Sequence, residues 1–289
     1  MRTLRRVISG LLAGGAIFGL LWLGARWSAP WVIGLPILGV AWLGALELLR
    51  LLDLAGISLS RRFYLPWIPI LVVMSVIAEG RYLNLAVVFA LGTQLVRHLG
   101  DLPQRDGLLR VGAACLSILY IPWLFHFLYR LYAFAPGGDR MAGLATVSVV
   151  LLMVWGFDSG AFFVGKLVGR HRAFPSVSPN KTWEGIVGGS LVAVVGALIG
   201  ACISPVWRTV VLWSGFHHLL ILGVLVSGAA QIGDLFESKL KRAAGIKDSG
   251  VFLPGHGGAL DRIDGLLFAL PVFFWYFEMF LRATLERVG

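Results

Sequence analysis

The residues best suited to chemistry lie between positions 238 and 264, a polar stretch in a chain that is otherwise mostly apolar. Four cationic side chains come first: Lys239, Lys241, Arg242 and Lys247. A flexible turn at 254–258 follows, and then Asp261 and Asp264, which a helix would carry on one face. Cations, glycines that expose the backbone and paired carboxylates are what a nucleoside triphosphate and its magnesium would need. The alternative is a solvated basic loop between two membrane helices.

Three further acidic residues, Asp158, Asp234 and Glu237, lie in or at the ends of apolar runs. An ionisable group in a membrane segment is costly and indicates function by default. The structural alternative is ion pairing, for instance of Asp158 with Lys166 two helical turns further along.

A second polar loop, at 169–182, ends just before another apolar run. Ser178, Lys181 and Thr182 would offer hydrogen-bond donors at the start of a helix, an arrangement suited to phosphate oxygens. For the Ser178-Pro179-Asn180 segment the alternative is a helix cap.

The composition indicates a polytopic membrane protein. The 289 residues are 58% hydrophobic and 14% charged, with a mean hydropathy of +0.83, whereas a soluble domain has about 25% charged residues. The net charge of +10 fits loops near anionic lipid and a site for anionic substrates. No polar domain with a basic face is present, so we expect no nucleic-acid partner. Cys115 and Cys202 lie in apolar runs and indicate packing rather than a disulfide or a zinc site.

Apolar runs predict an all-α fold of about nine transmembrane helices, in two regions: N-terminal helices over 1–140 and a catalytic region over 141–289. The runs are 7–25, 31–49, 65–78, 82–96, 111–128, one from about 142, 186–203, one from about 210 into Glu237, and one from Asp264 to about 281. The first run is read as a retained helix rather than a cleaved signal peptide. The third and fourth are short and could instead form a re-entrant hairpin.

The distribution of positive charge predicts the orientation. With the N-terminus in the cytoplasm, 18 of the 25 Lys and Arg residues fall on the cytoplasmic side and seven on the other. We therefore expect a cytoplasmic N-terminus, an external C-terminus and both motif loops facing the cytoplasm. Glycines four residues apart predict close helix packing rather than chemistry: Gly10/Gly14, Gly156/Gly160, Gly165/Gly169 and Gly185/Gly189.

The stretch at 238–264 resembles the signature of the phosphatidate cytidylyltransferase family, the CDP-diacylglycerol synthases. That signature reads Ser-x-apolar-Lys-Arg, four residues, Lys-Asp-x-small, two residues, apolar-Pro-x-His-Gly-Gly-apolar-x-Asp-Arg-apolar-Asp. The matching residues are Ser238, Lys241, Arg242, Lys247, Asp248, Gly250, Leu253, Pro254, His256, Gly257, Gly258, Asp261, Arg262, Ile263 and Asp264. Ala259 departs mildly, because a bulkier apolar residue is usual there.

Two upstream segments extend the resemblance. Asp158-Ser-Gly-Ala-Phe162 and Ser178-Pro-Asn-Lys-Thr-Trp-Glu-Gly185 follow the family's pattern, with Phe162 where tyrosine is often found. Gln231-Ile-Gly-Asp234, which leads into the signature, is typical of the family. The resemblance is strong over 150–270, whereas 1–140 is similar only in being membrane runs.

The resemblance implies transfer of CMP from CTP to phosphatidic acid, giving CDP-diacylglycerol and pyrophosphate at the cytoplasmic face of the cell membrane. Magnesium is the implied cofactor, held by Asp234, Asp261 and Asp264. The resemblance is also compatible with a second cation, either monovalent or divalent. The resemblance also implies a homodimer, as does the frequency of two-fold oligomers. Other implied roles go to the catalytic residues Lys241, Arg242 and His256 and the substrate-binding residues Ser178, Lys181, Thr182, Lys239, Lys247, Gly257, Gly258 and Arg262.

Two alternatives remain at the level of the sequence. A CTP-dependent lipid kinase of the dolichol kinase type would cleave CTP at its γ-phosphorus and release CDP. A lipid transporter or flippase would fit the hydropathy equally well, but it leaves the Lys/Arg/Asp cluster unexplained.

Overall fold

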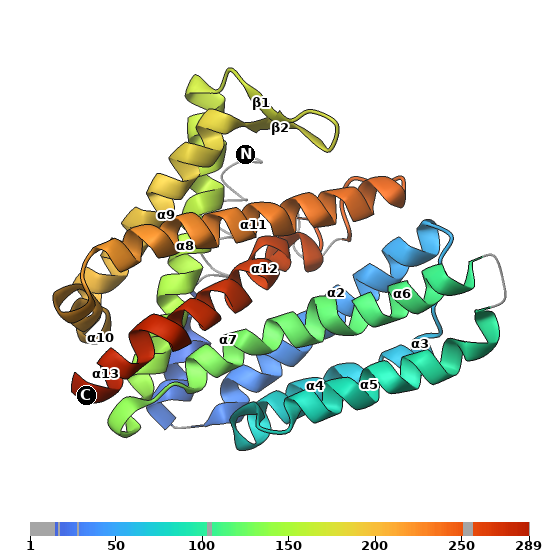
Figure 1. Cartoon of the computed structure of the whole chain (residues 1–289), viewed down its shortest axis with the longest axis horizontal. Helices are drawn as coiled ribbons and strands as arrows, with labels where there is room; N and C mark the ends of the chain where they lie inside the picture. The colour runs from blue at the N-terminus through green and yellow to red at the C-terminus, as the bar shows by residue number, and fades with distance from the viewer. Residues whose placement is uncertain (1–14, 17, 28, 103–105, 251–256, 289) are drawn as a thin grey trace. The chain divides into compact units, whose positions relative to one another are not determined.

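A computed structural model describes the chain except for residues 1–14, 17, 28, 103–105, 251–256 and 289 (Figure 1). The described residues are mostly helical, as the sequence predicted. They form two compact units, one of residues 1–130 and 239–263 and the other of 131–238 and 264–289. The predicted division into N-terminal helices over 1–140 and a catalytic region over 141–289 was a division by function, and it stays a prediction.

The first unit contains mainly helices from the N-terminal half: α2 (Pro30–Leu54), α3 (Arg61–Tyr64), α4 (Trp67–Val76), α5 (Leu83–His98), α6 (Gly107–Ile118) and the start of α7 (Leu124–Ala133). Helix α2 packs against α4 and α6, and Ala45 and Leu48 are fully buried on it. The Tyr64 hydroxyl donates a 2.8 Å hydrogen bond to the Ser117 carbonyl, which satisfies the polar end of a buried ring. The contacts of α2 with α4 and α6 fix its position in the unit.

The second unit contains α8 (Arg140–Val168), β1 (Arg172–Phe174), β2 (Ser178–Thr182), α9 (Trp183–Ile203), α10 (Pro205–Thr209), most of α11 (His217–Ala243), most of α12 (Leu260–Tyr276) and α13 (Arg282–Val288). Helices α8 and α9 are closely packed. A Cβ atom at Gly160 would lie 2.7 Å from Val192 Cγ2, and one at Gly189 would lie 2.7 Å from the Phe157 carbonyl oxygen. The prediction that the spaced glycines at 156/160 and 185/189 serve helix packing is therefore confirmed. The Gly10/Gly14 pair lies outside the described residues.

Strands β1 and β2 form an antiparallel hairpin at one end of the α8–α9 pair (Figure 1). The prediction of an all-α fold did not include this hairpin. Glu184, in the first turn of α9, accepts hydrogen bonds from the Arg170 and His171 backbone N–H groups and contacts His171 Nδ1 at 2.5 Å. These contacts tie the chain entering the hairpin to the helix leaving it. The helix cap is Thr182, whose hydroxyl accepts from Gly185 N at 3.2 Å, so the alternative of a cap at Ser178 was also wrong.

Among the described residues, seven helices are long and apolar enough to cross a membrane. They are Trp31–Leu54, Leu83–Asp101, Gly107–Ala133, Arg140–Val168, Trp183–Ile203, His217–Ala243 and Leu260–Glu286. The predicted run at 65–78 yields only α4, whose ten residues span about 15 Å where a bilayer core needs about 30 Å. The predicted run from 210 is interrupted at Gly215 (φ 98°), so the helix begins at His217. The run at 7–25 lies partly outside the described residues.

Candidate active site

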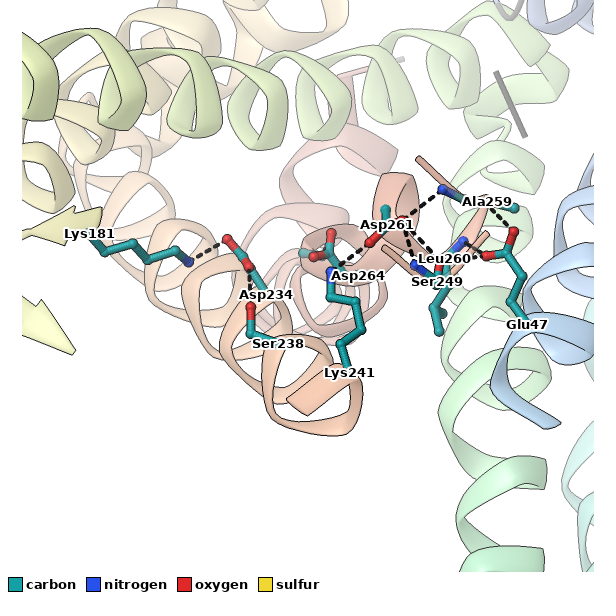
Figure 2. Close-up of polar contacts among 12 residues, drawn as sticks. Glu47, Lys181, Asp234, Ser238, Lys241, Ser249, Ala259, Leu260, Asp261 and Asp264 are labelled. Carbon is teal, nitrogen blue, oxygen red and sulfur yellow. Dashed lines mark hydrogen bonds and ion pairs between the residues drawn. The ribbon is translucent and has the colours of Figure 1, made fainter. Parts of the chain in front are cut away.

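The first group of predicted site residues surrounds Asp261, in the first turn of α12 (Figure 2). Its Oδ1 atom lies 2.6 Å from Lys241 Nζ near the end of α11, and both side chains are largely buried. Its Oδ2 atom accepts hydrogen bonds from Gly258 N (2.7 Å), Ser249 N (3.1 Å) and Ser249 Oγ (3.0 Å). Asp261 therefore closes the turn before α12, because it reaches back to a backbone N–H three residues earlier as a capping-box residue does.

A second carboxylate, Glu47 of α2, lies against the same turn (Figure 2). It accepts hydrogen bonds from Ser249 Oγ at 2.8 Å, Ala259 N at 2.9 Å and Leu260 N at 2.8 Å. Ser249 has one hydroxyl proton, so it bridges the carboxylates of Glu47 and Asp261 by donating to one of them at a time. The N-terminal end of α12 favours the negative charge of these two carboxylates.

The tight turn explains two glycines of the signature. Gly257 has φ 79°, a conformation that other residues rarely adopt, and a Cβ atom there would lie 2.6 Å from Asp261 Oδ2. At Gly258 a Cβ atom would clash with the Glu47 carboxylate and the Ser249 hydroxyl. Contacts with carboxylates are enough to explain why residues without a Cβ atom are needed at both positions. The approach of these glycines to phosphate stays a prediction.

The second group lies within the other unit, around Asp234 of α11 (Figure 2). Lys181 of β2 forms an ion pair with Asp234 Oδ2, and Ser238 Oγ donates to Asp234 Oδ1 at 3.3 Å. The hairpin thus brings a predicted phosphate-binding lysine to a predicted metal ligand. Asp234 and Lys181 are both partly exposed, with side-chain exposures of 36% and 21%.

Asp264 belongs to the same unit as Asp234. A Cβ atom at Gly233 would clash with the Asp264 carbonyl oxygen, and one at Gly265 would lie 3.3 Å from the Ala230 carbonyl oxygen. Helices α11 and α12 therefore approach closely beside Asp234 and Asp264. The Asp264 Oδ1 atom accepts from Gly265 N at 2.7 Å.

The remaining predicted residues divide by exposure. Four cations have exposed side chains and are open to anions in solution: Lys239, Arg242, Lys247 and Arg262. Ser178 is half-buried in β2, and Thr182 is buried as the cap of α9. His256 lies outside the described residues.

The carboxylates fit magnesium by chemistry, because it prefers hard oxygen ligands. Asp234 and Asp261 each face a lysine, whose ammonium a cation could replace. In the part of the chain that the structure describes, however, no three His, Cys, Asp or Glu side chains are grouped to hold a metal ion. The shared metal site stays a prediction.

Sequence reasoning missed Glu47 and Ser249. A signal for Glu47 was present, since it is a carboxylate inside the apolar run at 31–49, and the argument applied to Asp158 and Asp234 applies to it equally. Ser249 occupies a position that the signature leaves unspecified, so nothing in the pattern singled it out.

Comparison with known proteins covers nearly the whole chain. A family model described as "Cytidylyltransferase family" matches residues 4–280. A phosphatidate cytidylyltransferase of Haemophilus influenzae is 32% identical over 299 residues, which cover 96% of this chain and 99% of that protein.

Two relatives align over shorter stretches of the chain with higher sequence identity. The phosphatidate cytidylyltransferase of Bacillus subtilis is 38% identical over 170 residues, 59% of each chain. That of Staphylococcus saprophyticus is 42% identical over 161 residues, 55% of this chain and 56% of that protein. These two alignments span somewhat more than half the length of each relative. With the family model matched from residue 4 to residue 280, the chain belongs to the cytidylyltransferase family.

Proposed function

We propose that the protein is a phosphatidate cytidylyltransferase, which joins CTP and phosphatidic acid into CDP-diacylglycerol and pyrophosphate. The observation that carries the proposal is the shared name of relatives that are 32–42% identical, one of them aligned over 96% of this chain. The signature at 238–264 supports it independently, because its acidic and basic side chains are the groups that this reaction needs.

In the proposed reaction, an oxygen of the lipid phosphate forms a bond to the α-phosphorus of CTP. The bond between that phosphorus and the α–β bridging oxygen breaks, and pyrophosphate leaves with the electron pair. The lipid phosphate is already ionised at neutral pH, so the step needs no general base. What it needs is positioning of two anionic substrates that would otherwise repel one another.

The exposed cations Lys239, Arg242, Lys247 and Arg262 would bind the phosphates of both substrates through charge-assisted hydrogen bonds. Lys181 and Lys241 face Asp234 and Asp261, and they would turn toward phosphate once a cation takes their place. Asp234, Asp261 and Asp264 would hold magnesium, which when bound would neutralise the triphosphate and the leaving pyrophosphate.

We also propose that the active site faces the cytoplasm at the cell membrane and that the protein is a homodimer. The excess of Lys and Arg in alternate loops supports the orientation. Two-fold symmetry as the commonest oligomeric arrangement supports the dimer, which the mass of the purified protein–detergent complex would test.

The proposed function is tested with purified protein, phosphatidic acid, magnesium and one of CTP, ATP, GTP or UTP. We expect pyrophosphate and CDP-diacylglycerol with CTP alone. Release of CDP would instead identify a lipid kinase, and lipid movement across a vesicle without nucleotide turnover would identify a transporter. Either outcome contradicts the proposal.

A further inference from the structure

Glu47 is an acidic residue of α2 that contacts the candidate site from more than 200 positions away in the sequence (Figure 2). Its two carboxylate oxygens accept hydrogen bonds from the backbone N–H groups of Ala259 and Leu260 and from the Ser249 hydroxyl, at 2.8–2.9 Å. All of these residues belong to the first compact unit.

The two backbone donors are the groups that begin α12. The first N–H groups of a helix have no partner within it, and a neighbouring side chain normally accepts from them. Here the partner comes from α2, and glycines make room for it, because a Cβ atom at Gly250 or Gly258 would clash with the Glu47 carboxylate. The start of α12 is therefore fixed to α2 by charge-assisted hydrogen bonds.

Ser249 links this anchor to the predicted chemistry. It is fully buried, and its hydroxyl lies 2.8 Å from Glu47 Oε2 and 3.0 Å from Asp261 Oδ2. Asp261 in turn contacts Lys241. A continuous set of polar contacts thus runs from Glu47 through Ser249 and Asp261 to Lys241, and a displacement of Glu47 would move the Asp261 carboxylate.

We propose that Glu47 is a positioning residue for nucleotidyl transfer: it holds the first turn of α12 so that Asp261 and Lys241 are aligned for the substrate phosphates and their cation. This inference rests on the proposed function for its kinetic consequences. The hydrogen bonds that it invokes do not depend on that function.

The decisive variant is Glu47→Gln. Glutamine keeps the size of the side chain, but its NH₂ group is a donor and cannot accept from a backbone N–H. We expect kcat/KM for CTP to fall about 10- to 100-fold, and the magnesium concentration at half-maximal rate to rise, as when an outer-shell partner of a ligand is removed. Glu47→Asp keeps both acceptor oxygens and should recover part of the loss.

The matched control is Asp53→Asn on the same helix. Asp53 pairs with Arg61 at 3.4 Å at an exposed position, so this variant should keep the kinetics and magnesium dependence of the unmodified protein. Equal losses in Glu47→Gln and Asp53→Asn would overturn the proposal, since any change of an α2 carboxylate would then have the same effect.

A second measurement does not require activity. Hydrogen exchange at the Ala259 and Leu260 amides should be faster in Glu47→Gln and unchanged in Asp53→Asn. If the unmodified protein releases no pyrophosphate from CTP, the proposed function fails while exchange still tests the anchor. If exchange at these amides, kcat/KM and magnesium dependence all stay as in the unmodified protein, and only the yield of folded Glu47→Gln falls, Glu47 has a general structural role and the proposal is wrong.

Discussion

The oxygens of the Asp261 carboxylate are divided between two kinds of contact. Oδ2 accepts from Ser249 and Gly258 and closes the turn before α12, whereas Oδ1 contacts Lys241. The capping explanation for Asp261 is thus satisfied by one oxygen. The metal-binding role proposed for the same residue would use the other, in exchange for the lysine.

Lys241 and Arg242 are adjacent in the signature but differ in their surroundings. The Lys241 and Asp261 side chains are 14% and 7% exposed, so Lys241→Ala leaves a nearly buried carboxylate without its ammonium. Removing one partner of a buried ion pair costs about 3–5 kcal/mol. We expect Lys241→Ala to lower both the unfolding temperature and turnover. The measurements are thermal unfolding in detergent and pyrophosphate release.

Arg242→Ala is the matched comparison, because Arg242 is exposed. We expect its stability to change by no more than about 0.5 kcal/mol, while turnover falls through the loss of a phosphate contact. If the kinetics are unchanged in both variants, these residues do not bind substrate, and the stretch is a solvated basic loop between two membrane helices.

The carboxylate-to-amide changes Asp234→Asn and Asp264→Asn test the proposed metal ligands. Asparagine keeps the size and most of the hydrogen-bonding capacity of aspartate but loses the charge that a cation requires. We expect both variants to insert and purify normally and to lose magnesium-dependent turnover, measured across a magnesium titration. Near-full activity at ordinary magnesium would mean that the metal ligands lie elsewhere.

Asp261→Asn completes the series, with a different expectation. It should abolish turnover and also lower stability, because the amide weakens the contact with Lys241 and the hydrogen bonds from Ser249 and Gly258. A variant that is fully active would show that capping is the whole role of Asp261.

At the level of elements, the approach of α11 to α12 depends on the absence of a side chain at Gly233. A Cβ atom there would clash with the Asp264 carbonyl oxygen, which is backbone and cannot rotate away. We expect Gly233→Ala to separate the helices, to destabilise the protein by about 1–3 kcal/mol and to reduce turnover, since Asp234 and Asp264 lie beside this contact. Thermal unfolding and pyrophosphate release measure the two effects.

Gly228→Ala on the same helix is the control, because nothing lies within 4 Å of a Cβ atom at that position. Its stability should stay the same or rise by up to about 1 kcal/mol, because alanine is the better helix former. Equal destabilisation by both substitutions would refute the argument from the close approach and would point to a general effect of alanine in α11.

For the whole molecule, the testable property is the topology in the membrane. Three candidate spans follow the β1–β2 hairpin: Trp183–Ile203, His217–Ala243 and Leu260–Glu286. An odd number of crossings places the hairpin and the C-terminus on opposite sides. Reporters inserted within 173–180 and fused at Gly289 should therefore report the cytoplasm and the exterior, respectively. Reporters on the same side would contradict this topology.

Much of the site could be predicted from residue types and spacing. The apolar runs indicated membrane helices because about 20 apolar residues are needed to cross a bilayer, and the order of cations, glycines and carboxylates indicated phosphate chemistry. The strands at 172–182 were not predicted. The two strands pair with each other, and Glu184 contacts Arg170 and His171 just before them. Such contacts leave no periodic pattern in so short a segment.

The sequence by itself determined that this is a helical membrane protein of the cytidylyltransferase type, since hydropathy and the signature are local properties of the chain. Only the tertiary structure decided which partners the charged residues have: Lys181 with Asp234, Lys241 with Asp261, and Glu47 with the start of α12. The reason is that a charge drawn partly out of water is costly unless another group matches it, and packing decides which group that is. For Glu47 that group lies more than 200 residues away in the sequence, and the spacing of residues within a helix or strand predicts no contact over such a separation.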